Sequence, residues 1–411
     1  MRFYFYFFYE DISIVMPKES KRGSLLNQSP IRRLVPLARQ AKQKGHKVLH
    51  LNIGQPDIET PEAALEMVRK HPSPIVKYGP SEGLPELRAT VRDYYDKFNA
   101  NLIPEDIYVT TGASEAILFA LFATCNEGDE IIIPEPFYAN YIGFAQVCSV
   151  SILPVTTSLE SKFALPDPSE FEALITPRTK AIFLCNPGNP TGQLYDKAGL
   201  EALSAVVLKH DLFLIVDEVY REFCYNKPFT SVLALQELRD NVIVIDSISK
   251  VFSSCGARVG YLITSNSGVK QAVIKYAQLR LCPPYFGQLL ALACYENGDA
   301  YIDKAREEYR KRRSILSEGL KEIPGVQSYI PEAAFYNIAQ LPVENARIFC
   351  RWLLTDYDKD GQTVMLAPAD GFYFNQHLGQ QQVRIAYVLN EDDLKAALAV
   401  LKSGLEAYAQ L

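Results

Sequence analysis

The sequence predicts an α/β fold in which a mainly parallel β-sheet is flanked by helices. Between about residues 105 and 265, short apolar runs rich in β-branched residues alternate with stretches of helical period, which is the pattern of a parallel sheet. The length of 411 residues is large for a single core and favours two domains. An Arg- and Glu-rich helix over residues 303–320 is expected to lead from the sheet into a C-terminal α+β region.

The first strand of this sheet is predicted over residues 107–110, and an apolar helix is predicted over residues 117–124. Gly112 and Ser114 lie between them. Free backbone N–H groups at a helix N-terminus bind anions, and a glycine leaves them accessible. An anion site is expected here, although a strand, a glycine and a helix start occur together in many α/β proteins.

A second strand is predicted over residues 180–185, and the loop 186–192 follows it. This loop contains two Asn-Pro steps and two glycines, which make it rigid and non-helical. Such a loop can hold the amide of Asn189 in a fixed place. An ordinary tight turn would not need both Asn-Pro steps.

A third strand over residues 213–216 ends in Asp217, and Tyr220 follows shortly after. A carboxylate at the end of a buried strand needs a partner, because burial without one is costly. The simplest alternative is an acidic residue that caps the following helix, which is the commoner role for an isolated Asp-Glu pair.

A fourth strand over residues 241–246 is followed by Ser247, Ser249, Lys250 and Arg258. An amine becomes a nucleophile only when it loses its proton, and both burial and a neighbouring cation favour that loss. Hydroxyl groups and a guanidinium are suitable donors to a phosphate. The alternative is a surface loop in which the lysine and the arginine are merely solvated.

Together these groups indicate pyridoxal phosphate bound by a Schiff-base lysine, Lys250. The ring nitrogen of that cofactor works as an electron sink only while it is protonated, and Asp217 would hold this proton. Tyr220 would donate to the phenolic oxygen of the ring.

The four segments, in this order, resemble the class I/II aminotransferases, which are fold type I pyridoxal-phosphate enzymes, over roughly residues 24–405. The S-x-S-K and G-x-R-x-G pattern, the N-P-x-N-P-T-G loop and the D-x-x-Y step of that family are all present. The resemblance implies a large cofactor-binding domain with a mainly parallel seven-stranded sheet over residues 56–300. A smaller α+β domain would combine residues 16–55 with residues 301–411.

The resemblance also implies roles for individual residues. Lys250 would form the Schiff base and shuttle the proton, Asp217 would pair with the ring nitrogen, and Asn189 and Tyr220 would donate to the ring hydroxyl. The implied phosphate ligands are Gly112, Ala113, Ser114, Ser247, Ser249 and Arg258.

Further positions follow from the same resemblance. Tyr138 would stack on the cofactor ring, with a core aromatic as the alternative, and Tyr78 would reach the phosphate in the partner subunit of a homodimer. Arg384 would grip the α-carboxylate of the substrate, unless it is an exposed strand arginine. The backbone of Gly54 and the side chain of Asn189 would complete the substrate site.

The implied activity is a ping-pong transamination that moves the amino group of an L-amino acid, aspartate foremost, to a 2-oxo acid. Some aspartate aminotransferases carry a lysine for the distal carboxylate where this chain has Ser114. Arg32, Arg33 or Arg280 would have to substitute for it, unless these are solvated surface charges. A pyridoxal-phosphate C–S β-lyase uses the same lysine and aspartate, and a non-catalytic regulator with this fold is a further alternative.

Composition limits the other classes of function. The chain is 48% hydrophobic and 22% charged with a net charge of −6, which disfavours nucleic acid as a partner. Its eight cysteines form no C-x-x-C pair, and its five histidines are scattered. We therefore expect buried free thiols in a reducing cytoplasm and no metal site. Cys255 is interpreted as a packing residue rather than a reactive thiol.

Residues 1–15 are intensely aromatic and are assigned no function. Their apolar run ends at Glu10 and Asp11, without a small-residue cleavage site, so a secretory signal is disfavoured. A membrane-spanning helix would need about 20 apolar residues. An extra edge strand, or a translated upstream segment before a start at Met16, is expected instead.

Overall fold

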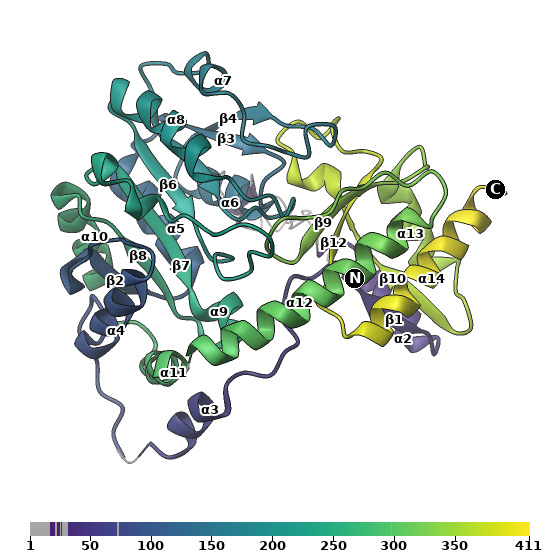
Figure 1. The fold of residues 1–411 in the computed structure, drawn as a ribbon, viewed down its shortest axis with the longest axis horizontal. Helices are drawn as coiled ribbons and strands as arrows, with labels where there is room; N and C mark the ends of the chain where they lie inside the picture. The colour runs from purple at the N-terminus through teal and green to yellow at the C-terminus, as the bar shows by residue number, and fades with distance from the viewer. Residues whose placement is uncertain (1–16, 21–22, 25, 27–31, 72–73, 297) are drawn as a thin grey trace, which may run out of the picture.

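The computed structural model describes residues 17–20, 23–24, 26, 32–71, 74–296 and 298–411. The aromatic segment 1–15, for which an edge strand is one of the predictions, lies outside these residues. Figure 1 shows a large layered α/β part and a smaller part, with the long helix α12 (Gly298–Lys321) running from one to the other. Most described strands and helices of the large part come from the middle of the chain.

The large part contains the seven-stranded sheet that the family resemblance implies, in the order β2-β8-β7-β6-β5-β3-β4. Every neighbouring pair is parallel except the two pairs that involve β8, so the predicted mainly parallel sheet is confirmed. The strands are β2 (Ile107–Thr110), β3 (Glu130–Glu135), β4 (Ser151–Thr156), β5 (Thr179–Cys185), β6 (Phe213–Asp217), β7 (Val242–Ser247) and β8 (Gly260–Ile263).

Helices cover both faces of this sheet, which is why its strands are apolar on both sides. Alternate strand residues enter two separate cores: Val244 belongs to a core that includes residues of α4, α8 and α11, and its neighbour Ile245 belongs to a core that includes residues of α5, α6 and α10. The helices are α4 (Pro85–Asp96), α5 (Ala113–Thr124), α6 (Asn140–Val147), α8 (Lys197–Lys209), α10 (Ser267–Arg280) and α11 (Tyr285–Glu296).

The smaller part is built from segments near both ends of the sequence. Strand β1 (Lys47–His50) pairs in parallel with β10 (Gln362–Met365), and β12 (Gln382–Ala386) pairs with both β11 (Ala367–Pro368) and β9 (Tyr336–Gln340). Helices α2 (Val35–Gln43), α13 (Ala346–Thr355) and α14 (Glu391–Tyr408) pack on these strands. The exact domain boundaries at residues 56 and 301 stay a prediction.

The connecting helix α12 (Gly298–Lys321) is longer than the predicted 303–320. Its first turns belong to the core of the large part through Ile302, whereas Leu316 and Leu320 belong to the core of the smaller part. Because both ends are buried in different cores, packing extends the helix beyond its charged centre.

The remaining helices are short: α3 (Glu62–Arg69), α7 (Pro168–Glu172), α9 (Ile248–Val251), and the 3₁₀ turns η1 (Pro104–Asp106), η2 (Val232–Ala234), η3 (Gln236–Leu238), η4 (Cys255–Ala257) and η5 (Ala369–Phe372). Among the residues described here, none of the helices combines the length and the apolar character needed to cross a bilayer.

Candidate active site

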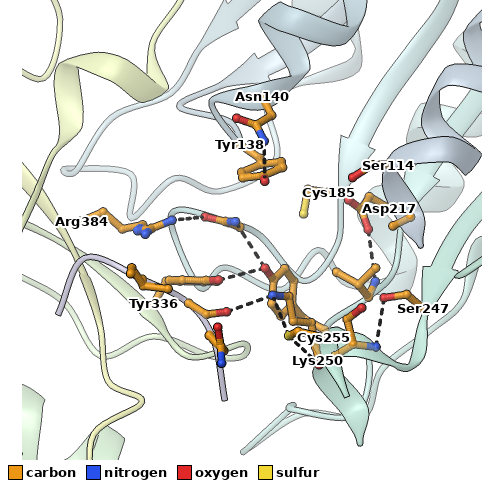
Figure 2. Close-up of a pocket in the computed structure, with 18 of the residues that line it drawn as sticks. Ser114, Tyr138, Asn140, Cys185, Asp217, Ser247, Lys250, Cys255, Tyr336 and Arg384 are labelled. Atoms are coloured by element: carbon orange, nitrogen blue, oxygen red, sulfur yellow. Dashed lines mark hydrogen bonds between the residues drawn. The ribbon is translucent and has the colours of Figure 1, made fainter. Parts of the chain in front are cut away.

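A cavity of about 750 Å³ lies at the carboxyl ends of β5, β6 and β7, where it also meets β9 and β12 of the smaller part. This edge of a parallel sheet is where α/β proteins commonly bind their ligands. Figure 2 shows Lys250, Asp217, Tyr138 and Arg384 lining the cavity from different sides. Residues from four distant sequence segments therefore meet in one place.

Lys250 lies in the four-residue helix α9, one turn beyond the end of β7 rather than directly at the strand end. Its Nζ donates to the carbonyl oxygen of Gly54 at 2.9 Å and lies 3.8 Å from the Sγ of Cys255. Burial lowers the pKa of Lys250, and the positive charge of Arg384 contributes to the same direction. The neutral amine that a nucleophile or a base requires is thus favoured.

Asp217 is the last residue of β6, and its carboxylate is buried. Tyr141 donates to its Oδ2 at 2.8 Å, and the backbone N–H of Val219 donates to its Oδ1 at 3.3 Å. Burial raises the pKa of Asp217 to about 6 despite these two donors. A cation beside this carboxylate would keep it ionised.

Three side chains form a buried chain of hydrogen bonds above Lys250. Asn189 donates from Nδ2 to the hydroxyl oxygen of Tyr220 at 3.3 Å, and the hydroxyl groups of Tyr220 and Tyr336 lie 3.0 Å apart. The loop after β5 thus places the Asn189 amide at the cavity, where it contacts both Tyr220 and Arg384.

Arg384 lies in β12 and is 2% exposed. Its Nη1 donates to the Oδ1 of Asn189 at 3.2 Å, and its Nη2 donates to the carbonyl oxygen of Asn52. The rings of Tyr336 and Phe372 lie 4.7 and 4.8 Å from the guanidinium carbon. Its buried Nε has no partner among the described residues, so the group retains a donor for an anion.

The residues predicted to bind the phosphate lie at the N-terminus of α5 and beside it in the cavity. Gly112 precedes this helix with a φ of 74°, and a Cβ there would lie 2.4 Å from an Arg258 nitrogen, so only glycine fits. The other predicted phosphate ligands all line the cavity: Ala113, Ser114, Ser247, Ser249 and Arg258. Two of their donors are partly engaged, since Arg258 donates to the Cys255 carbonyl at 3.0 Å and the Ser249 N–H to the Ser247 hydroxyl at 3.3 Å.

This donor set suits pyridoxal phosphate. Hydroxyl groups, free helix N–H groups and an exposed guanidinium match a phosphate dianion, while the buried Asp217 and Lys250 match the ring nitrogen and the aldehyde. No lining carboxylate lies among the residues that form the phosphate end of the cavity.

Tyr138 and Gly54 also border the cavity, as the sequence predicts. The Tyr138 hydroxyl accepts a hydrogen bond from Nδ2 of Asn140 at 2.8 Å. A Cβ on Gly54 would lie 1.7 Å from the hydroxyl of Tyr336, so this close approach requires glycine. Tyr78 is different, because its side chain is 80% exposed and does not border the cavity of its own chain.

The three arginines considered as ligands of a distal substrate carboxylate lie in different places in the structure. Arg280 pairs with Glu115 at 3.0 Å and donates to the Ser81 carbonyl at 2.8 Å, and it does not border the cavity. Arg33 lines a second cavity of about 500 Å³. Only Arg32 of the three borders the main cavity.

Several residues of the site lie outside the motifs recognised in the sequence. Tyr141 follows Tyr138 by one helical turn in α6, and this spacing alone could have suggested a shared surface. Tyr336 comes from β9, and Arg39 comes from α2, both far from the recognisable motifs. Their presence depends on the packing of the smaller part against the sheet.

All eight cysteines are free, but the prediction of buried thiols holds only for Cys294 and Cys350, since the other six are partly exposed. Among the described residues, no cluster of three or more His, Cys, Asp or Glu could hold a metal ion.

Comparison with known proteins identifies the family. The profile of the family described as "Aminotransferase class I and II" matches residues 46–401. The chain belongs to the class I and II aminotransferases. The family resemblance, the fold class and pyridoxal phosphate as the cofactor are thereby confirmed, and this aminotransferase is an enzyme that transfers amino groups between amino acids and 2-oxo acids.

Its relatives include aminotransferases named for different substrates. The aspartate/prephenate aminotransferase of Thermus thermophilus is 30% identical, over 88% of this chain and 92% of that protein. The structure of an aspartate aminotransferase from Thermus thermophilus with maleate has a TM-score of 0.85 at 28% identity, covering 95% of this chain and 100% of the other. An alanine aminotransferase from Pyrococcus furiosus has a TM-score of 0.87 at 30% identity with the same coverage.

Proposed function

We propose that this aminotransferase acts on dicarboxylic L-amino acids, aspartate foremost, with a 2-oxo acid as the acceptor. The observation that carries this proposal is the charge of the cavity. Its described lining contains four arginines but one carboxylate, Asp217. The arginines are Arg32, Arg39, Arg258 and Arg384. The phosphate would engage Arg258 and the α-carboxylate would engage Arg384, so Arg32 and Arg39 remain for a second substrate carboxylate.

The relatives give partial support to this choice. One similar structure is an aspartate aminotransferase with maleate, which is a dicarboxylate, but another is named an alanine aminotransferase. The names of relatives near 30% identity do not agree on one substrate, so the charge of this cavity carries the argument.

Lys250 is the proposed base of the reaction. When bound, pyridoxal phosphate supplies an aldehyde carbon for the amino group and an electron sink for the carbanion. The Nζ of Lys250, with a lowered pKa, would be neutral when displaced by the substrate amine, and it would then take the proton from the substrate Cα. The first product would leave before the acceptor binds, which is a ping-pong sequence.

The other residues would orient the reactants. Asp217 would hold the proton on the ring nitrogen, Asn189 and Tyr220 would donate to the ring hydroxyl, and Tyr138 would stack on the ring. Arg384 would bind the α-carboxylate in a bidentate manner, with the Gly54 backbone beside it. The phosphate would be held by the N-terminus of α5 with the ligands predicted above: Gly112, Ala113, Ser114, Ser247, Ser249 and Arg258.

We also infer a homodimer in which Tyr78 reaches the phosphate of the partner's site. The support is a set of exposed apolar side chains beside Tyr78, because such patches are typical of interfaces. Val76 is 52%, Leu279 82% and Leu281 52% exposed, and the hydrogen bond from Arg280 to Ser81 joins the two segments.

Two measurements test the dimer. Sedimentation should give twice the chain mass. Mixing inactive Lys250→Ala subunits with weakened Tyr78→Ala subunits should restore activity, because hybrids would contain one site with both residues intact. No gain on mixing would show that Tyr78 does not act across the interface.

The substrate is tested with the purified holoenzyme. Aspartate with 2-oxoglutarate should release oxaloacetate at a kcat/KM well above that of alanine with the same acceptor. A preference for alanine would contradict the proposed substrate, and ammonia release without an acceptor would identify elimination instead. We further propose that the enzyme acts in the cytoplasm, which cell fractionation would test.

A further inference from the structure

One face of α2 and of the turn that leads into it, here called the α2 face, borders the cavity; Arg32 in the turn and Arg39 in the helix are among its lining residues. Arg32, Val35, Pro36 and Arg39 are all lining residues. Their spacing of three, four and seven residues places them on a single helix face. The backbone N–H of Val35 donates to the Arg32 carbonyl at 3.1 Å, so Arg32 belongs to the same helical turn.

These two guanidinium groups differ from the other arginines near the site. Arg384 and Arg258 donate to carbonyl or amide oxygens, and Arg280 is paired with Glu115. Both Arg32 and Arg39 are exposed, and neither guanidinium group has an ion pair or a hydrogen bond with the described part of the chain. Among the described residues, nothing accepts a hydrogen bond from either guanidinium group.

Arg32 lies close to the reacting region. Burial raises the pKa of Tyr138, and the positive charges of Arg384, Arg32 and Arg258 oppose that rise. Arg32 therefore belongs to the group of cations around this ring. Of these three, the proposed function uses Arg384 for the α-carboxylate and Arg258 for the phosphate, so Arg32 has no ligand assigned.

We infer that the α2 face formed by Arg32 and Arg39 binds the distal carboxylate of the substrate and thereby determines the preference for dicarboxylic amino acids. The inference rests on the proposed function. It explains how such a preference can arise although Ser114 offers no charge and Arg280 is engaged elsewhere. A guanidinium group can provide the planar, bidentate contact that a carboxylate favours, and this face offers two such groups to the cavity.

The test compares Arg32→Gln, Arg39→Gln and the double variant as holoenzymes, with Arg33→Gln as the matched control. Arg33 is exposed on the same turn but lines the second cavity. We expect kcat/KM for aspartate to fall about 10- to 100-fold in the double variant while that for alanine stays within about twofold. Arg33→Gln should behave like the unsubstituted enzyme with both substrates.

A binding measurement gives an independent readout. Calorimetric titration should show that the double variant loses affinity for maleate, a dicarboxylate, by about tenfold or more. Affinity for the monoamide of maleate, which lacks one charge, should be the same in both proteins. Unchanged thermal unfolding would show that the variants are folded.

The outcomes separate the inference from the proposed function. If the unsubstituted enzyme prefers aspartate and the double variant keeps that preference, the inference is wrong while the proposed function stands. If the unsubstituted enzyme prefers alanine and binds maleate no better than its monoamide, both are wrong. Equal losses for aspartate and alanine would also overturn the inference, since they would indicate a general effect on the site.

Discussion

Two groups of cavity residues differ in how they are held. The buried residues, such as Arg384 and Asp217, are here called the floor, and the exposed arginines Arg32 and Arg39 on and just before α2 are called the α2 wall. On the floor, Arg384 and Asp217 are 2% and 5% exposed and are held by specific hydrogen bonds. On the wall, Arg32 and Arg39 are exposed and make no such contacts with the described residues. Groups that are buried and fixed suit steps shared by all substrates, whereas exposed side chains can adjust to one substrate or another.

The difference also sets the size of the effects to be expected. Charges in a buried, preorganised site interact strongly because little solvent screens them, while exposed charges are screened by water and salt. Substitutions on the floor should therefore affect every substrate and cost more than substitutions on the wall.

The largest effect is expected at Lys250. Replacing it by alanine removes both the amine that binds the cofactor and the proposed base, so the rate of the first half-reaction should fall at least about a thousandfold for aspartate and alanine alike. Stopped-flow absorbance measures this rate. Lys275→Ala, an exposed lysine on α10, is the control and should be unaffected. Retention of most of the rate in Lys250→Ala would refute the assignment of this residue.

Arg384→Gln should lower kcat/KM about a hundredfold for both substrates, because every amino acid has an α-carboxylate and a buried charge-assisted contact is lost. Steady-state kinetics with aspartate and alanine give the comparison. A loss confined to aspartate would mean that Arg384 belongs functionally with the α2 wall, and the contrast between the two regions would fail.

Asp217 gives a pH-dependent effect in the cofactor-free protein. Its pKa is raised from 3.8 to about 6, so the folded form binds more protons than the unfolded form in that interval, and the free energy of unfolding should fall as pH rises through it. The Asp217→Asn variant has no carboxyl group to ionise, so its free energy of unfolding should not fall in this way. That free energy should exceed the value for the unsubstituted apoprotein by about 2–3 kcal/mol at pH 8, with no difference at pH 4.

Denaturant unfolding of both apoproteins at the two pH values measures this difference. Equal free energies of unfolding at pH 8 would show that burial of the ionised carboxylate does not destabilise the folded apoprotein. Holoenzyme prepared from the same variant should be impaired in catalysis, so stability and activity should change in opposite directions.

Tyr336→Phe should have a moderate effect. The variant keeps the ring over Arg384 but removes the hydroxyl that contacts Tyr220, so a loss of about three- to tenfold in kcat/KM is expected for both substrates. Tyr357→Phe, which removes a hydroxyl bonded to Ser403 far from the cavity, is the matched control. A loss above a hundredfold would assign Tyr336 a direct part in the chemistry.

The smallest effect concerns salt. Because the α2 arginines are exposed, raising the ionic strength from about 0.01 to 0.15 M should increase KM for aspartate a few-fold more than KM for alanine. Kinetics of the Arg32 and Arg39 double variant should lose this difference. The same salt dependence for both amino acids would indicate that the wall does not discriminate between them.

Local sequence patterns were sufficient to predict most of the floor residues. Lys250, Asp217 and Asn189 each lie at or shortly after the carboxyl end of a buried apolar strand, and parallel strands bring those ends to one edge of a sheet. The period of the strands and the chemistry of the residues after them therefore predict the fold class, the cofactor and the position of these groups.

The remainder depended on tertiary packing. Tyr336 and Arg39 enter the cavity because β9 and α2 belong to the smaller part, whose core joins both ends of the chain. Tertiary structure also separated Arg32, Arg33 and Arg280, which the sequence offers as equivalent charges. Which side of a helix faces a cavity, and which cation has a nearby carboxylate, are set by contacts between residues far apart in the chain, and local patterns carry no information about those contacts.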